Sequence, residues 1–298
     1  MIKEYAVEPR LLATWERFRY ITEKFGDSEG RLISRYPKKW IAMVYDSLEE
    51  DSELRKKKIE EKLKEIKKKM MNRILPPEWD RDLNWLPNAI REDSVHPFHA
   101  ILALENPHSN ARVLPYSELQ ENHPLWKVAR ACVVPRIASN LAMAVLPLLQ
   151  VAETIIFVDP YFSPTKPKAV KTLKAFLEKL DLNHGSKRIE YHTKLTEDNP
   201  RFEKDCHEYV SKCIPTGMSL KIIRWSESDM PEGLHNRYIL TDRGGVSFHW
   251  GLDEGNPGET DDISLLDGEV YTNRWNRHCA EARPDRAANT ITVSGSLE

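Results

Sequence analysis

The sequence has few cysteines, and their spacing excludes the common metal motifs. The four cysteines form no CxxC pair, and we interpret them as reduced packing residues of a cytoplasmic protein. A zinc site built from Cys206, His207 and Cys213 would need His207 on the cysteine face of a helix, and the spacing turns it away from that face. We therefore expect no metal and no cofactor.

The sequence also lacks segments that would place it in or across a membrane. No run of eighteen apolar residues occurs, so no membrane span is expected. The first residues, 1–5, do not have the pattern of a signal peptide. With 40% hydrophobic and 30% charged residues, the composition is typical of a globular protein whose 298 residues suffice for two domains.

The charges nearly balance overall, but positive charge is concentrated in one helix. The formal net charge is -2, whereas residues 55–73 contain ten Lys or Arg and three Glu. The segment 51–73 reads as a helix because apolar residues recur at a 4-3-4 spacing and form a narrow seam. These residues are Ile59, Leu63, Ile66 and Met70.

Two interpretations of this basic helix stay open. A lysine-rich surface is often a solvated helix face and nothing more. Clustered cations also release counterions from nucleic acids, which makes the helix a candidate nucleic-acid contact. The residues predicted for that contact are Lys56, Lys57, Lys58, Lys67, Lys68 and Lys69.

The pattern of the chain predicts three parts. Residues 1–75 read as a mostly helical, basic region, and residues 76–125 as an irregular connecting region. Residues 126–298 are predicted to form an α/β domain, because short apolar runs at 154–158, 189–193 and 218–225 alternate with helical patterns. Such alternation predicts a mainly parallel sheet with flanking helices.

Polar residues follow the first two predicted strands of this sheet. Ligands of such sheets bind beyond the carboxyl ends of the strands. Asp159 and Tyr161 at the end of the first strand, and His192 and Lys194 at the end of the second, are therefore predicted to form a phosphate-binding edge.

The stretch 234–242 is predicted to be the strand that completes this edge. On a strand His235 and Arg237 share a face, and Asp242 lies near the turn made by the following double glycine. An imidazole can attack phosphorus, a guanidinium binds phosphate oxygens, and a carboxylate can orient the imidazole. We predict a catalytic group of His235, Arg237 and Asp242. The alternative is a strand edge with a salt bridge between Arg237 and Asp242.

This spacing, His-x-Arg-x-x-x-x-Asp, resembles the HxKxxxxD motif of the phospholipase D superfamily, with Arg237 in place of Lys. The usual GSxN continuation is missing. Instead Gly251-Leu252-Asp253 and the earlier Asp159-Pro160-Tyr161 resemble the phospholipase D-like domain at the C-terminus of MIT-domain proteins. The resemblance covers about residues 150–275 and implies a phospholipase D-like fold for the C-terminal part.

Two functions follow from the resemblance. The first is a metal-independent phosphodiesterase, most plausibly a nuclease, with His235 as nucleophile, a second His as general acid, and two chains meeting as a dimer. The retained His235 and Asp242 favour it. The second is a catalytically inactive module that binds nucleic acid, a nucleotide or another phosphate-bearing partner as a sensor or assembly subunit. This alternative is favoured by Arg237, which stands where the superfamily motif has a lysine.

Overall fold

The computed structural model describes residues 1–49, 52–73, 79–180, 187–196, 199–226, 235–279 and 289–296. The chain divides into two compact units, which we name the N-terminal unit (Ile2–Ala129) and the C-terminal unit (Arg130–Glu298, with Met1). Over the described ranges, no helix is both long enough and apolar enough to cross a membrane.

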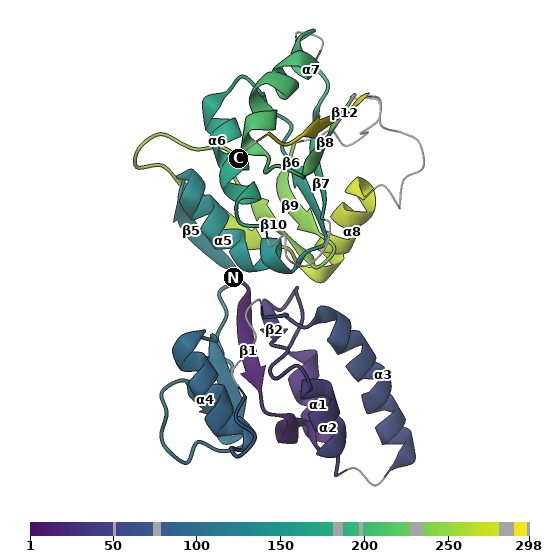
Figure 1. The fold of residues 1–298 in the computed structure, drawn as a ribbon, viewed down its shortest axis with the longest axis vertical. Coiled ribbons are helices and arrows are strands. Elements are labelled where there is room, and N and C mark those ends of the chain that lie inside the picture. The colour runs from purple at the N-terminus through teal and green to yellow at the C-terminus, as the bar shows by residue number, and fades with distance from the viewer. Residues whose placement is uncertain are drawn as a thin grey trace. The chain divides into compact units, whose positions relative to one another are not determined.

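The N-terminal unit is built on a small sheet of four short parallel strands. Its strand order is β2-β1-β3-β4, and every pairing is parallel. Tyr5 and Val7 of β1 pack in one buried cluster with side chains of the helices at 15–23, 40–46 and 53–69, and Ala6 packs in a second cluster with the helix at 85–95 (Figure 1). The elements are β1 (Lys3–Val7), η1 (Pro9–Leu12), α1 (Trp15–Glu23), β2 (Arg31–Ile33), α2 (Trp40–Asp46), α3 (Glu53–Lys69), α4 (Trp85–Val95), β3 (Ala100–Ala103), β4 (Val113–Pro115) and η2 (Tyr116–Glu118).

This unit differs from the predicted division into a helical region 1–75 and a connecting region 76–125. Residues of both segments belong to one compact unit, because β3 pairs directly with β1 and completes its sheet. A strand was predicted at Phe98 to Leu104, where β3 lies, whereas the short β1, β2 and β4 were not recognised beside longer helical patterns. The predicted boundary at Pro76-Pro77 lies outside the described residues.

The apolar seam of the basic helix packs into the core of its own unit. Ile59 and Leu63 are fully buried on α3, and Met70, just after the helix, is 3% exposed. Ile66 is partly buried against the same cluster. The predicted seam is therefore confirmed, and it holds α3 against the N-terminal unit.

The C-terminal unit contains an eight-stranded sheet with helices on both faces (Figure 1). The strand order is β12-β8-β7-β6-β9-β10-β11-β5. The predicted α/β class with a large sheet and flanking helices is confirmed. The elements are β5 (Ala131–Pro135), α5 (Ala138–Val151), β6 (Thr154–Val158), α6 (Pro167–Leu177), β7 (Arg188–Lys194), α7 (Phe202–Asp205), η3 (Cys206–Val210), η4 (Ser211–Cys213), β8 (Ser219–Trp225), β9 (Arg237–Thr241), β10 (Gly244–Phe248), β11 (Thr260–Leu265), α8 (Gly268–His278) and β12 (Asn289–Ser294).

The sheet was predicted to be mainly parallel, but its strands run in mixed directions, and most of the described pairings are antiparallel. β6, β7 and β8, which the strand-helix alternation predicted, are parallel to one another. β9 pairs antiparallel with β6, and β10, β11 and β5 continue antiparallel from it. The start of β9 therefore lies beside the end of β6, where the predicted site residues are.

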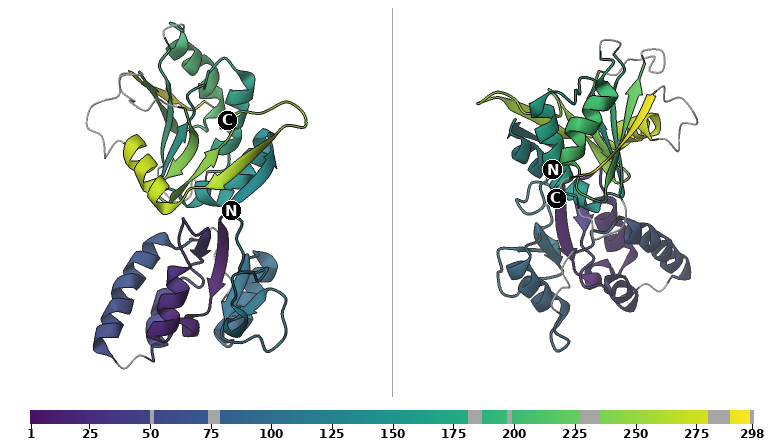
Figure 2. Two further views of the ribbon diagram at one scale, coloured as in Figure 1. Left: turned by 180° about the vertical axis from the view of Figure 1, so that it is seen from behind. Right: turned by 45° about the horizontal axis from the view of Figure 1, so that its top comes forward.

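The two faces of the sheet are covered by different helices (Figures 1 and 2). On one face, Val158 and Tyr238 pack with Trp275 of α8. On the other face, Phe157 stacks on Phe176 of α6, with ring centroids 5.5 Å apart. Because side chains alternate along a strand, the face of a residue follows from its position relative to these.

Candidate functional site

Arg237 is the first residue of β9 and lies next to the end of β6. The strand register pairs Tyr238 with Val158, which places Arg237 opposite Asp159 and on the α6 side of the sheet. The guanidinium carbon lies 4.9 Å from the centre of the Tyr161 ring, a cation–π contact. Among the described residues, none forms a hydrogen bond or ion pair with this guanidinium, and its Nε is buried without a hydrogen-bond partner.

Asp159 joins the two short sequence blocks that carry the resemblance. Its Oδ1 accepts the backbone N–H of Tyr161 at 2.9 Å, and its Oδ2 accepts that of Leu252 at 3.0 Å. Burial raises the pKa of Asp159, and these two donors and the Arg237 guanidinium act against that rise. The buried carboxylate is thus an organiser of two loops, with Arg237 as its nearby counter-charge.

Gly251 allows the second block to approach Asp159 closely. A Cβ atom at this position would lie 2.8 Å from Asp253 Oδ1 and 3.5 Å from Asp159 Oδ2. Asp253 in turn accepts a 2.7 Å hydrogen bond from Arg136, whose other terminal nitrogen contacts Glu259 at 3.2 Å. In the Gly251-Leu252-Asp253 block, the glycine is needed for this close approach and the acid binds Arg136.

His235 lies two residues before Arg237 and is exposed to solvent. Its imidazole has no hydrogen-bond partner among the residues that the structure describes. β9 begins at Arg237, so His235 precedes the strand, and its pairing with Arg237 on one strand face remains a prediction. The predicted orientation of His235 by Asp242 does not fit the position of Asp242.

Asp242 lies at the opposite end of β9. Its Oδ1 accepts the backbone N–H groups of Glu153 and Thr154, each at 2.9 Å, where β6 begins. Five residues separate it from Arg237, roughly 17 Å at the rise of an extended strand. Because β9 is antiparallel to β6, the strand itself carries Asp242 away from the site, so its assignment to a catalytic group with His235 is corrected to a structural role. The alternative salt bridge to Arg237 is excluded for the same reason.

We predict that Asp242→Asn leaves phosphate binding unchanged, because the retained Oδ1 still accepts both N–H groups. Asp242→Ala should lower the free energy of unfolding by about 1–2 kcal/mol through the lost acceptor, again without changing affinity. Urea unfolding and a ligand titration of both variants measure the two effects. A loss of affinity in a stably folded Asp242→Asn protein would return this residue to the site.

His192 and Lys194 lie on the other face of the sheet. His192 pairs with Val158 in register and is fully buried toward α8. Its Nδ1 accepts a 3.2 Å hydrogen bond from Trp225 Nε1, and its Nε2 contacts Glu190 Oε2 at 3.1 Å. Both residues were predicted to bind phosphate beside Asp159. The alternation along β7 directs His192 and Lys194 away from Arg237, which corrects that assignment.

Several residues of the site could not be recognised from the sequence. Trp250 follows β10 and is 60% exposed, and the Arg136 guanidinium carbon lies 5.8 Å from its ring centre. Asp261 is buried and accepts the backbone N–H groups of His249 and Trp250. In β11 buried and exposed residues alternate, which is typical of a strand. The acidic residues around 259–262 made this alternation hard to recognise in the sequence.

The six lysines predicted to contact nucleic acid lie on α3 in the N-terminal unit. All are exposed except Lys56, which is partly buried and pairs with Glu53 at 3.3 Å. They surround the buried seam on several sides of the helix and do not form a single stripe. Their distribution is that of a highly charged, solvent-facing helix, and a contact with nucleic acid remains a prediction.

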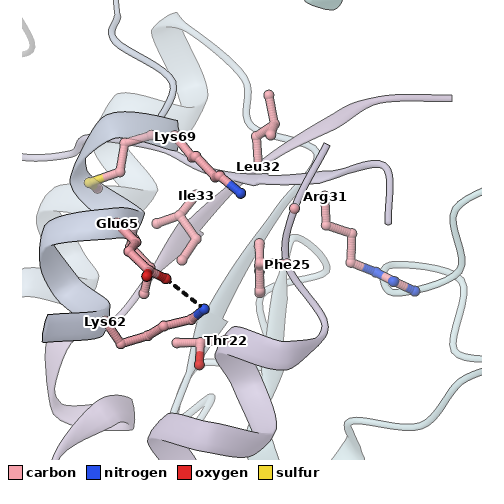
Figure 3. A pocket seen from close by; sticks show the side chains of 11 residues that line it. Thr22, Phe25, Arg31, Leu32, Ile33, Lys62, Glu65 and Lys69 are labelled. Atoms are coloured by element: carbon pink, nitrogen blue, oxygen red, sulfur yellow. Dashed lines mark hydrogen bonds and ion pairs between the residues drawn. The ribbon is translucent and has the colours of Figure 1, made fainter. Parts of the chain in front are cut away.

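A hollow lies beside α3, against the end of α1 and β2 (Figure 3). Phe25, Leu32 and other apolar side chains line much of it. The Nζ of Lys62 is 2.9 Å from Glu65 Oε2, so its charge is already compensated. Of the six lysines, only Lys69 lines this hollow. The hollow is therefore a weaker anion site than the edge at Arg237.

No group of three or more potential metal-ligating side chains occurs within the described ranges. The two cysteines considered for a zinc site are buried, and burial raises the pKa of Cys206 to about 12 and that of Cys213 to about 11. Thiols held in this way are poor nucleophiles. Among the described residues, the chemistry at this edge is therefore that of Arg237, His235 and the nearby aromatic rings.

Comparisons with known proteins add little. No family model matches the sequence, and no curated protein matches it. Among solved structures, a match is found to TrmBL2, an archaeal chromatin protein whose structure is described as showing a novel mode of DNA binding. The match has 13% identity and a TM-score of 0.26, and covers 51% of this chain and 52% of that one. The chain thus spans about half the length of TrmBL2, and at this TM-score the likeness supports no conclusion.

Proposed function

We propose that the C-terminal unit is a binding module for a phosphate-bearing partner, most directly a nucleic acid. The observation that carries the proposal is Arg237, a guanidinium at a sheet edge with no hydrogen bond or ion pair to any described residue. Its fork of N–H donors matches two phosphate oxygens at once. The Tyr161 ring contacts the guanidinium on one side.

The placement of the other predicted catalytic residues favours binding over hydrolysis. A catalytic imidazole usually has a partner that fixes its orientation and tautomer. His235 has none among the described residues, Asp242 is at the far end of the strand, and His192 faces α8. These placements favour the catalytically inactive module, as does the arginine at position 237, where the superfamily motif has a lysine.

Phosphodiester hydrolysis is a second candidate function, and one observation favours it. His235 is exposed and lies two residues before Arg237, so a phosphate bound by the guanidinium would be within reach of the imidazole. In this case His235 attacks phosphorus and a second imidazole protonates the leaving oxygen. That second group would come from another copy of the chain, which makes the active species a dimer.

The two functions are separated by one experiment. Purified protein is incubated with DNA, RNA and bis-p-nitrophenyl phosphate in excess EDTA, beside His235→Ala. The binding module is expected to retain nucleic acid without turnover in either protein. Turnover that is present in the wild type and abolished in His235→Ala would establish the hydrolase instead.

A further prediction concerns α3. If this helix also contacts nucleic acid, neutralising its lysines should weaken binding and flatten the dependence of log affinity on log salt, because fewer counterions are released. The same number of changes outside α3, including Lys38, Lys39 and Lys127, is the control. A salt slope equal to that of the wild type would assign the helix to solubility. The variant that neutralises α3 replaces six lysines by glutamine, at Lys56, Lys57, Lys58, Lys67, Lys68 and Lys69.

A further inference from the structure

Two large aromatic side chains are exposed beside the Arg237 edge. Trp250 is 60% exposed and Tyr161 is 57% exposed, the latter with its ring against the guanidinium of Arg237. Aromatic residues of this size are usually well buried, because leaving their apolar surface in water costs free energy. Their exposure at the same edge therefore needs an explanation.

The backbone at both aromatic residues is held by buried carboxylates. Asp159 accepts the N–H of Tyr161 through one oxygen and that of Leu252 through the other. Asp261, which is 1% exposed, accepts the N–H of Trp250 at 3.2 Å. The backbone positions are thus fixed while the rings face solvent, which lowers the entropy lost when a ligand stacks on them.

The charged groups around the rings include one cation without an ion pair among the described residues. Asp253 and Glu259 share the single guanidinium of Arg136, and Glu254 pairs with Lys171 at 2.9 Å. The buried carboxylates of Asp159 and Asp261 accept backbone N–H groups, and that of Asp159 interacts electrostatically with Arg237. The edge therefore combines the Arg237 guanidinium, which forms no ion pair there, with two flat apolar surfaces.

We propose that this edge binds single-stranded nucleic acid, with unpaired bases stacking on Trp250 and Tyr161 while Arg237 binds a backbone phosphate. The inference rests on the proposed function and names the ligand class. Stacking needs bases whose faces are accessible, and those faces are covered in a duplex. Any base has such a face, so the site is expected to have little sequence preference.

The test compares two fluorescent oligomers of equal length and charge, an oligothymidylate and its abasic counterpart, by anisotropy with the full chain. Trp250→Leu is expected to weaken oligothymidylate binding roughly 5- to 150-fold and to leave the abasic oligomer unchanged. Tyr161→Leu also removes the ring that contacts Arg237, so it is expected to weaken oligothymidylate binding more than abasic binding. Both side chains are exposed, so the variants should fold. Tyr209→Leu, at a tyrosine that is 40% exposed on η3, is the matched control and should bind both oligomers as the wild type does.

The possible failures are distinguishable. If Arg237→Ala weakens both oligomers but Trp250→Leu and Tyr161→Leu weaken neither, the stacking proposal is overturned and the phosphate site stands. If the wild type binds neither oligomer, or Arg237→Ala changes neither, the proposed function itself is overturned. Binding to phosphatidylserine vesicles that is lost in Trp250→Leu, with oligothymidylate binding unaffected, would assign the aromatic edge to a membrane surface.

Discussion

Replacing Arg237 by alanine is expected to weaken the binding of a phosphate-bearing ligand by about 1.5–3 kcal/mol, or roughly 10- to 150-fold. The guanidinium has no hydrogen bond or ion pair to another described residue, but its charge favours the ionised form of buried Asp159, so a loss of stability is also expected. Isothermal titration of the folded variant with a short oligonucleotide measures the effect on the ligand, and urea unfolding measures the effect on stability.

Two further variants sharpen this result. Arg237→Lys keeps the charge but loses the fork, so affinity should fall by an intermediate amount if two phosphate oxygens are bound together. Arg243→Ala removes the same side chain type from the turn at the other end of β9 and is the matched control. Equal losses from Arg237→Ala and Arg243→Ala would indicate nonspecific charge attraction.

The second large effect is expected for Asp159→Ala, on stability. This substitution leaves the backbone N–H groups of Tyr161 and Leu252 without their acceptor, and an unsatisfied buried donor costs about 1–3 kcal/mol. Part of that loss is offset because a buried charge is also removed, so we expect a decrease of about 2–3 kcal/mol in the free energy of unfolding. Chemical denaturation at neutral pH measures it.

The control for this change is Asp262→Ala, an exposed acid on β11, which should alter stability by less than about 0.5 kcal/mol. The pH dependence provides a second check. Because burial raises the pKa of Asp159 above its ordinary value of 3.8, protonation favours the folded state. The stability of the wild type relative to Asp159→Asn should therefore fall as the pH rises from below 3.8 through the raised pKa, and then level off. A rise over this range would contradict the account.

The strand-helix alternation of the sequence predicted the parallel core of the C-terminal unit. β6, β7 and β8 are apolar runs separated by amphipathic helices, and their periodicity is a local property. β11 was not predicted because Asp261 is buried in it, and a buried acid reads as a surface residue. β1 was not predicted for a different reason. Its five residues lie beside a longer helical pattern and show little strand periodicity of their own.

The structure brings only some of the predicted site residues together, and the departures have a common physical cause. Spacing along a strand determines which face a residue lies on, but it does not determine where the strand lies in the sheet. Arg237 and Asp159 come together because β9 pairs antiparallel with β6. The same pairing carries Asp242 to the far end, and the register with β7 turns His192 to the α8 face. Strand direction and register depend on contacts distant in sequence, which a single sequence does not reveal.

The most direct test of the central claim is the affinity of a labelled oligonucleotide for the wild type and for the His235→Ala, Arg237→Ala double variant, measured by anisotropy at one fixed salt concentration. The phosphate site at the start of β9 predicts a loss of at least about tenfold in the double variant, whether or not the protein is an enzyme. Equal affinity of the two proteins would contradict it and would leave this strand with a structural role alone.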